Sequence, residues 1–228
     1  MDAAGLLMQS VTTFNDKLKR DDHGRYRSWE HCYKEFYEAR SNPQADLGYL
    51  SLHLAFYLAS WGMYRGSSFL LQKDYLVHAP IVQEVLKGGY DPLLGIECVD
   101  IRREPNLELL TNLGDTIKSL YKEAGVSPTD TLITKVLMGT LGCVPAYDRY
   151  FIAGIRDQLV AGKGCYSYGR KSITALADFY VENSEVLERA RSGLKADGLE
   201  YPQMKMLDMG FWQKGFDLDP SNANKEAH

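Results

Sequence analysis

The feature that most constrains the fold is an unbroken apolar run, YLSLHLAFYLASWGMY, at residues 49–64. Apart from His53 and two serines, each face of a helix formed by this run would be apolar. A helix that is apolar on all sides is buried on all sides, and this run is too short to span a bilayer. We therefore predict that residues 50–64 form the buried central helix of the domain.

Helical patterns dominate the rest of the chain as well. Apolar residues recur at helical spacing in segments at residues 7–18, 28–40, 80–88, 110–120, 129–141, 148–159 and 172–192. Residues 91–103 suit a short strand or a helix equally, and no two segments form a convincing strand pair. The prediction is a compact all-α fold. One helical domain covers residues 1–216 and can divide into two lobes with a cleft between them, followed by a disordered tail at 217–228.

The composition excludes some classes of protein. The 228 residues carry a net charge of −4, which argues against a strongly cationic nucleic-acid binder but leaves room for a local basic face. The N-terminus has Asp2 and no basic segment, so no secretory signal is expected. Cys32, Cys98, Cys143 and Cys165 are widely spaced and form no metal-ligand pattern. We therefore expect reduced thiols, a cytoplasmic location and no metal site.

The most informative segment is TLITKVLMGTLGCVPAYDRYF, at residues 131–151. In Ser-Pro-Thr-Asp at 127–130, Ser127 resembles a helix cap, Pro128 the first helical position and Asp130 an acid that answers the cap. Gly142 predicts the end of this helix, and Asp148 can cap the next one. Lys135 lies within the apolar helix, where desolvation favours a neutral, nucleophilic amine. A nearby carboxylate can stabilise positive charge on a sugar, as in glycoside hydrolysis. The simpler alternative is that Lys135 is solvated and Asp148 is only a helix cap.

Residues 134–148 also carry a family resemblance. Thr134-Lys135-Val136, followed by Val144-Pro145 and then Asp148, resembles the helix-hairpin-helix DNA glycosylases of the 8-oxoguanine type. The resemblance is confined to this segment, and GVSPTD stands where the family has a Leu-Pro-Gly-Val-Gly hairpin.

This resemblance implies a specific chemistry. Lys135 would attack the sugar and form a Schiff base, and Asp148 would be the essential carboxylate. The partner would be DNA with a damaged or modified base, which the enzyme flips out of the helix and excises in DNA repair or in defence against phage. No metal or organic cofactor is implied, and the oligomeric state is left open.

Other residues could contact such a substrate. A basic run extends from Arg149 to Lys171 and suits phosphate contacts and base stacking. Its basic members are Arg149, Arg156, Lys163, Arg170 and Lys171, and the tyrosines interleaved with them are Tyr147, Tyr150, Tyr166 and Tyr168. The segment SWGMYRGSSFLLQ at 60–72 offers a base pocket or a wedge for the gap left by a flipped nucleotide, through Trp61, Tyr64, Arg65 and Gln72. The ordinary alternatives are a solvated loop for the first group and core packing for the aromatic residues of the second.

Two further functional classes fit the sequence. Arg25 and His31 form an Arg-x5-His pattern that falls within the range of the HEPN ribonuclease motif. An arginine and a histidine on one helix face could cleave RNA by stabilising a phosphorane and moving a proton. In the other class the chain is a non-catalytic helical interaction module, and all of these features serve packing or capping.

Overall fold

The computed structural model describes residues 3–66, 68–157, 166–196 and 198–222. It confirms the all-α prediction, because the described strands are only β1 (Lys195–Ala196) and β2 (Leu199–Glu200). These two form an antiparallel hairpin in which Lys195 pairs with Glu200. No helix in the described ranges combines the length and apolar character that crossing a membrane requires.

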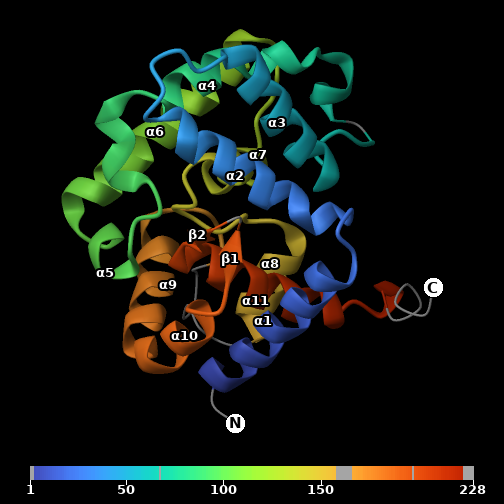
Figure 1. The fold of residues 1–228 in the computed structure, drawn as a ribbon, viewed down its shortest axis with the longest axis vertical. Coiled ribbons are helices and arrows are strands. Elements are labelled where there is room, and N and C mark those ends of the chain that lie inside the picture. The colour runs from blue at the N-terminus through green and yellow to red at the C-terminus, as the bar shows by residue number, and fades with distance from the viewer. Residues whose placement is uncertain (1–2, 67, 158–165, 197, 223–228) are drawn as a thin grey trace.

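The helices form an upper and a lower group in Figure 1, with α2, α3, α4, α6 and α7 above and α1, α8, α9, α10 and α11 below. In chain order the helical elements are α1 (Ala3–Arg20), η1 (Arg25–Arg27), α2 (Ser28–Ala39), α3 (Leu47–Ser60), η2 (Phe69–Gln72), η3 (Tyr75–His78), α4 (Ala79–Val85), η4 (Gly88–Leu93), α5 (Cys98–Ile101), α6 (Glu104–Glu123), α7 (Asp130–Thr140), α8 (Arg149–Asp157), α9 (Arg170–Glu182), α10 (Ser184–Arg191), α11 (Gln203–Asp217) and η5 (Pro220–Asn222).

The central helix is α7 rather than α3. Every residue of α7 from 132 to 140 is buried, and α2, α3 and α6 pack against it. The prediction that the 50–64 helix is buried on all sides is wrong, because Leu52 and Phe56 of α3 are 51% and 62% exposed. The reason is position: α3 covers α7 from outside, so only its inner face, which includes Leu54 and Leu58, enters the core.

Local signals set the boundaries of α7, but its start differs from the prediction. The helix begins at Asp130 and not at Pro128, and its cap is Thr129 rather than Ser127. The Thr129 hydroxyl accepts a hydrogen bond from the Leu132 amide at 3.2 Å and caps the helix. Gly142 ends it with a φ of 64°, in the left-handed region that favours glycine. The chain then continues through residues 143–147, which are all buried, and reaches Asp148 at the start of α8.

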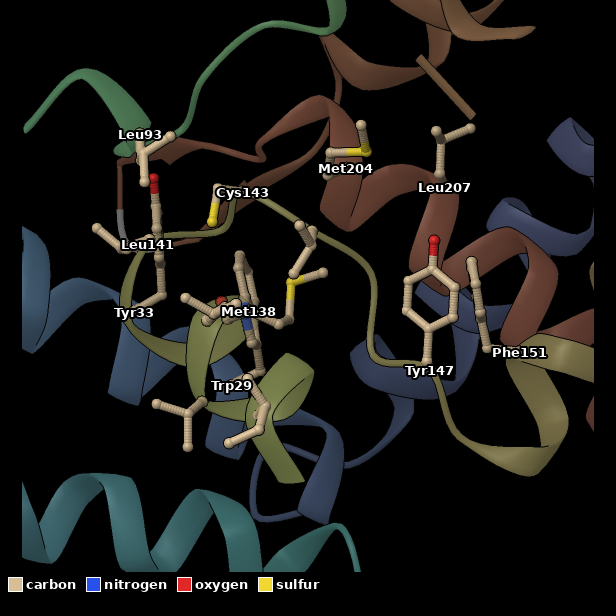
Figure 2. Packing of buried hydrophobic residues seen from close by; sticks show 14 of the residues in the cluster. Trp29, Tyr33, Leu93, Met138, Leu141, Cys143, Tyr147, Phe151, Met204 and Leu207 are labelled. Atoms are coloured by element: carbon tan, nitrogen blue, oxygen red, sulfur yellow. The ribbon is translucent and has the colours of Figure 1, made fainter. Parts of the chain in front are cut away.

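The second central helix is α11, which is buried throughout residues 203–213. It crosses α8 at very short range. A Cβ atom on Gly154 of α8 would lie 1.9 Å from the Phe211 carbonyl oxygen, and one on Gly215 of α11 would lie 1.8 Å from the Tyr150 carbonyl oxygen. The two backbones therefore touch where no side chain fits. Phe151 of α8 packs near Leu207 of α11 beside this crossing (Figure 2).

Three other expectations are revised. Residues 91–103, left open between strand and helix, contain the end of η4 and the short helix α5. The single helix expected at 172–192 is divided at Asn183 into α9 and α10. The tail expected to be disordered from residue 217 contains Asp217, the last residue of α11, and the whole of η5. Within η5, the Asn222 side-chain amide donates hydrogen bonds to the Tyr150 hydroxyl and the Phe216 carbonyl. Residues 223–228 lie outside the described residues.

The crossing of α8 and α11 generates a stability prediction. Gly154→Ala should lower the free energy of unfolding by about 3 kcal/mol or more, because the added methyl group forces the two backbones apart. Gly89→Ala is the matched control, since a Cβ atom there meets nothing within 4 Å. Urea unfolding of both variants checks this prediction. Equal, small losses in the two variants would show that the helices do not cross at this distance.

Candidate active site

A cavity of about 670 Å³ lies where α7, the start of α8, α11 and the loop after α3 meet. This volume falls within the usual range for sites that bind small organic groups. The lining residues are Arg25, Ala59, Ser60, Trp61, Gly62, Met63, Arg65, Thr131, Lys135, Asp148, Arg149, Tyr150, Trp212, Phe216 and Asn222. Of the predicted site residues, the structure thus brings together Lys135, Asp148, Trp61, Arg65 and Arg149.

Lys135 points from α7 into this region and not into bulk solvent. Its side chain is only 4% exposed, and its Nζ atom lies 3.3 Å from Asp148 Oδ2. The same amine donates a hydrogen bond to the Trp61 carbonyl oxygen at 2.9 Å. The interpretation of Lys135 as a solvated helix residue is therefore wrong. Its amine is held by two oxygen acceptors at the wall of the cavity.

Asp148 is a helix cap and an ion-pair partner at once. Its Oδ1 accepts hydrogen bonds from the Tyr150 and Phe151 amides, both at 3.1 Å, at the N-terminus of α8. Its Oδ2 faces Lys135, and the side chain is 14% exposed. Capping and ion pairing thus coexist, because each uses a different carboxylate oxygen. The cap fixes the orientation in which Oδ2 faces the amine.

The surroundings of Lys135 favour the neutral form of its amine more than bulk water would. Burial lowers the pKa of the Lys135 amine, and the charge and hydrogen bond of Asp148 oppose this effect without cancelling it. A lysine with a lowered pKa loses its proton more readily and becomes a nucleophile. The carboxylate beside it can accept that proton. The pair is therefore suited to nucleophilic attack on an electrophilic carbon bound in the cavity.

Aromatic rings form one wall of the cavity. Trp61 and Trp212 lie almost perpendicular, with ring centroids 5.4 Å apart. Trp212 also contacts the rings of Tyr150 and Phe216. Its indole Nε1 is buried and meets no hydrogen-bond acceptor within the described part of the chain. The wall is therefore apolar and aromatic, and it contains one buried donor without a partner among the described residues.

Three arginines surround the cavity on its exposed side. Arg25 of η1 stacks over the Trp61 ring at 5.3 Å, and Arg149 stacks over the Tyr150 ring at 4.4 Å. Arg149 also lies 3.7 Å from Asp219, whereas neither Arg25 nor Arg65 has a carboxylate partner among residues 3–66, 68–157, 166–196 and 198–222. The entrance is therefore basic, although the whole chain is acidic.

The predicted residues Tyr64, Gln72 and Tyr147 do not line this cavity. The Tyr64 hydroxyl is 2.6 Å from Nε2 of the buried His78, and Gln72 is exposed in η2. The Tyr147 hydroxyl is 2.6 Å from the Ser172 hydroxyl, inside the core. Figure 2 shows Tyr147 packed beside Phe151. Tyr64 therefore serves the packing of the fold, as its simpler alternative expected. Tyr147 also packs in the core, so the solvated loop that was its alternative is wrong for this residue.

The basic run after Asp148 is also dispersed. Arg156 stacks over the Tyr166 ring, Arg170 pairs with Glu104, and Lys171 is exposed at the start of α9. None of the three lines the cavity. Lys163 lies outside the described residues. Among the described basic residues of this run, Arg149 alone lines the cavity, and Tyr150 lines it as well.

Arg25 and His31, the candidates for RNA cleavage, are separated by their elements. Arg25 belongs to η1 and His31 to α2, where it is exposed. Arg25 lines the cavity, and His31 does not. The structure thus assigns Arg25 to the same site as Lys135 and leaves His31 outside it.

Sequence reasoning missed the contribution of α11. The pattern of MKMLDMGFW, at residues 204–212, is typical of a short amphipathic piece, but its Lys205, Asp208 and Trp212 lie along one face of a buried helix. Their spacing of i, i+3 and i+7 was the available signal. Lys205 and Asp208 pair with each other at 2.9 Å. This pairing allows a helix with the composition of a surface helix to lie in the core.

No protein-family model, curated protein or solved structure matches the chain. The described residues contain no group of three or more histidine, cysteine, aspartate or glutamate side chains arranged to hold a metal ion. Interpretation of the site therefore rests on the geometry of its own residues.

The buried ion pair can be measured by a double-mutant cycle. Lys135→Gln and Asp148→Asn, alone and combined, should give a coupling free energy of about 1–3 kcal/mol in urea unfolding. The exposed pair Arg189–Glu185 provides the control, and its cycle should give about 0.5 kcal/mol or less. A coupling for Lys135 and Asp148 as small as the control would mean that the two groups do not interact in the folded protein.

Proposed function

We propose that the protein is a DNA N-glycosylase that excises a damaged or modified base. The observation that carries this proposal is the buried Lys135–Asp148 pair at the wall of an aromatic cavity with a basic entrance. An amine and a carboxylate in this arrangement suit displacement at the sugar C1′ carbon. The resemblance of residues 134–148 to the helix-hairpin-helix glycosylases assigns the same roles to the same two residues.

In the proposed reaction the lone pair of the Lys135 amine forms a bond to C1′. The bond between C1′ and the base breaks, and the base leaves with the electron pair and takes up a proton. Asp148 stabilises the positive charge that develops on the sugar and accepts a proton from the lysine nitrogen. Transfer of that proton from Asp148 to the ring oxygen then opens the sugar and leaves a protonated imine. The nitrogen gives up its remaining proton, which balances the proton taken up by the base, and an imine joins Lys135 to C1′. These steps use no metal ion or organic cofactor.

The cavity walls suggest how a flipped nucleotide is held. Trp61, Tyr150 and Trp212 line the cavity in which a base that has left the duplex would be held. Arg25, Arg65 and Arg149 lie where they can contact the phosphates on either side of that base. The aromatic residues then select the extruded base, and the arginines bind the backbone irrespective of sequence.

The imine step can be tested with a duplex oligonucleotide that contains an abasic site, because its aldehyde needs no prior base release. Sodium borohydride should reduce the imine and yield a covalent protein–DNA adduct. Lys135→Gln should lower adduct formation by at least about 100-fold, since the nucleophile is gone. Lys122→Gln, which changes an exposed lysine of α6, should leave it unchanged.

Base release completes this test. DNAs that contain oxidised, alkylated or deaminated bases are incubated with the protein, and released bases are measured by mass spectrometry. Asp148→Asn should abolish release from the DNA that the wild-type protein cleaves. Base release that survives in Lys135→Gln but not in Asp148→Asn would replace the lysine by a water activated by Asp148. Neither adduct nor released base with the wild-type protein would reject the proposed function.

The basic entrance gives a second prediction. The double variant Arg25→Glu/Arg65→Glu should weaken binding to DNA by more than about tenfold at low salt and lower the slope of log K against log salt by about 2. Arg170→Glu/Lys171→Glu reverses the same number of charges away from the cavity. Fluorescence anisotropy with labelled duplex DNA distinguishes the two. Stronger weakening by the second variant would move the DNA-binding surface to α9.

A further inference from the structure

A second lysine–aspartate pair lies beside the first. Lys205 Nζ is 2.9 Å from Asp208 Oδ2, and the two side chains are 5% and 9% exposed. A separate small cavity of about 10 Å³ is lined by both pairs, together with Tyr57, Trp61, Ala146 and Trp212. That volume is close to the minimum needed for one water molecule. Two lysines and two aspartates therefore line the same small cavity.

The second pair is turned away from the substrate cavity. Neither Lys205 nor Asp208 is among the residues that line the large cavity. The Lys205 amine lies over the rings of Trp29 at 4.9 Å, Phe14 at 5.5 Å and Trp61 at 5.8 Å. These rings enclose the ammonium group within the core. Lys205 can therefore influence a reaction at Lys135 only through space.

Asp208 has a structural connection to the catalytic carboxylate. Its Oδ1 accepts a hydrogen bond from the Ala146 amide at 2.9 Å. Ala146 precedes Asp148 by two residues, in the buried segment that joins α7 to α8. The Thr134 hydroxyl accepts from the Tyr147 amide at 3.0 Å and holds the next residue of the same segment. Asp208 thus fixes the backbone that carries Asp148.

Burying the two charges of Lys205 and Asp208 lowers the stability of the fold, so their presence in the core calls for a reason. An apolar pair of similar volume would fill the same space without the desolvation cost, and such replacements are often neutral or stabilising. We propose that Lys205 and Asp208 are positioning residues, which hold Asp148 in place and set the protonation of Lys135 for the reaction. This inference rests on the proposed function of the Lys135–Asp148 pair.

The two residues act on Lys135 in opposite directions. Burial lowers the pKa of the Lys135 amine most strongly, Asp148 and Asp208 raise it, and the positive charge of Lys205 lowers it. Tyr57 of α3 also faces these groups, and burial raises its pKa, so it is neutral near pH 7. Arg25 and Arg149 lie at the exposed side of the large cavity.

The opposite signs define the experiment. Lys205→Met removes the neighbouring positive charge, so the pKa of Lys135 should rise by about 0.5 or more. Asp208→Asn keeps an oxygen acceptor for the Ala146 amide and removes the negative charge, so the same pKa should fall. The ¹³Cε signals of labelled lysines, titrated by NMR without DNA, report these values. Lys135→Gln identifies the Lys135 signal by its loss.

The pH dependence of borohydride trapping is the second measurement of the Lys135 pKa. The pH midpoint of borohydride trapping on abasic-site DNA should move up in Lys205→Met and down in Asp208→Asn, by the same amounts as the titrations. Lys205→Arg retains the charge and should restore the wild-type midpoint, and Lys122→Met should leave it unchanged. If Lys205→Met does not fold, the double variant Lys205→Met/Asp208→Asn replaces it, because it leaves no unpaired charge. The pKa of Lys135 in this double variant should lie between the values in the wild-type protein and in Asp208→Asn.

The outcomes separate this inference from the function on which it rests. Opposite shifts in both titration and trapping support it. Wild-type trapping with no shift, or with shifts of the same sign in the two variants, overturns the inference and leaves the proposed function standing. Opposite shifts in the titration, with no trapping by the wild-type protein at any pH, reject the proposed function and the catalytic role of the second pair together.

Discussion

The contact between the backbones of α8 and α11 at Gly154 and Gly215 is the constraint on which the site depends. With glycine at both positions, the helices approach until backbone meets backbone. This approach places the N-terminus of α8, with Asp148, close to the face of α11 that carries Asp208 and Trp212. A side chain at either glycine would separate these groups by more than a hydrogen bond tolerates.

The same arrangement places charge where a protein core normally has none. Lys135 occupies the most buried helix of the fold, and its ammonium group loses hydration that Asp148 and the Trp61 carbonyl restore only in part. Buried ion pairs of this kind seldom increase stability, and strain of this sort collects at functional sites. The site is thus expected to lower the stability of the fold in exchange for a reactive amine.

Local signals in the sequence predicted the parts of the site that depend on neighbouring residues. The Gly142 turn and the Asp148 cap each involve groups within a few positions, and both are present in the structure. The cap of α7 also lies in the expected segment, but it is Thr129 and not Ser127. The sequence predicted α3 as the central helix, and the structure has α7 there. This could not be foreseen, because apolar periodicity reports the polarity of a segment and not which elements pack against it. Lys205 and Asp208 were missed for the same reason, since a buried charged pair has the composition of a surface helix.

The central claim is that the Lys135 amine, alone among the amines of the protein, forms a covalent bond to the sugar C1′ carbon. The most direct measurement is to digest the borohydride-reduced adduct with abasic-site DNA and to locate the modified residue by tandem mass spectrometry. The account predicts that the sugar remnant is found on Lys135. A remnant on another lysine or on the N-terminal amine, with Lys135 unmodified, would contradict it.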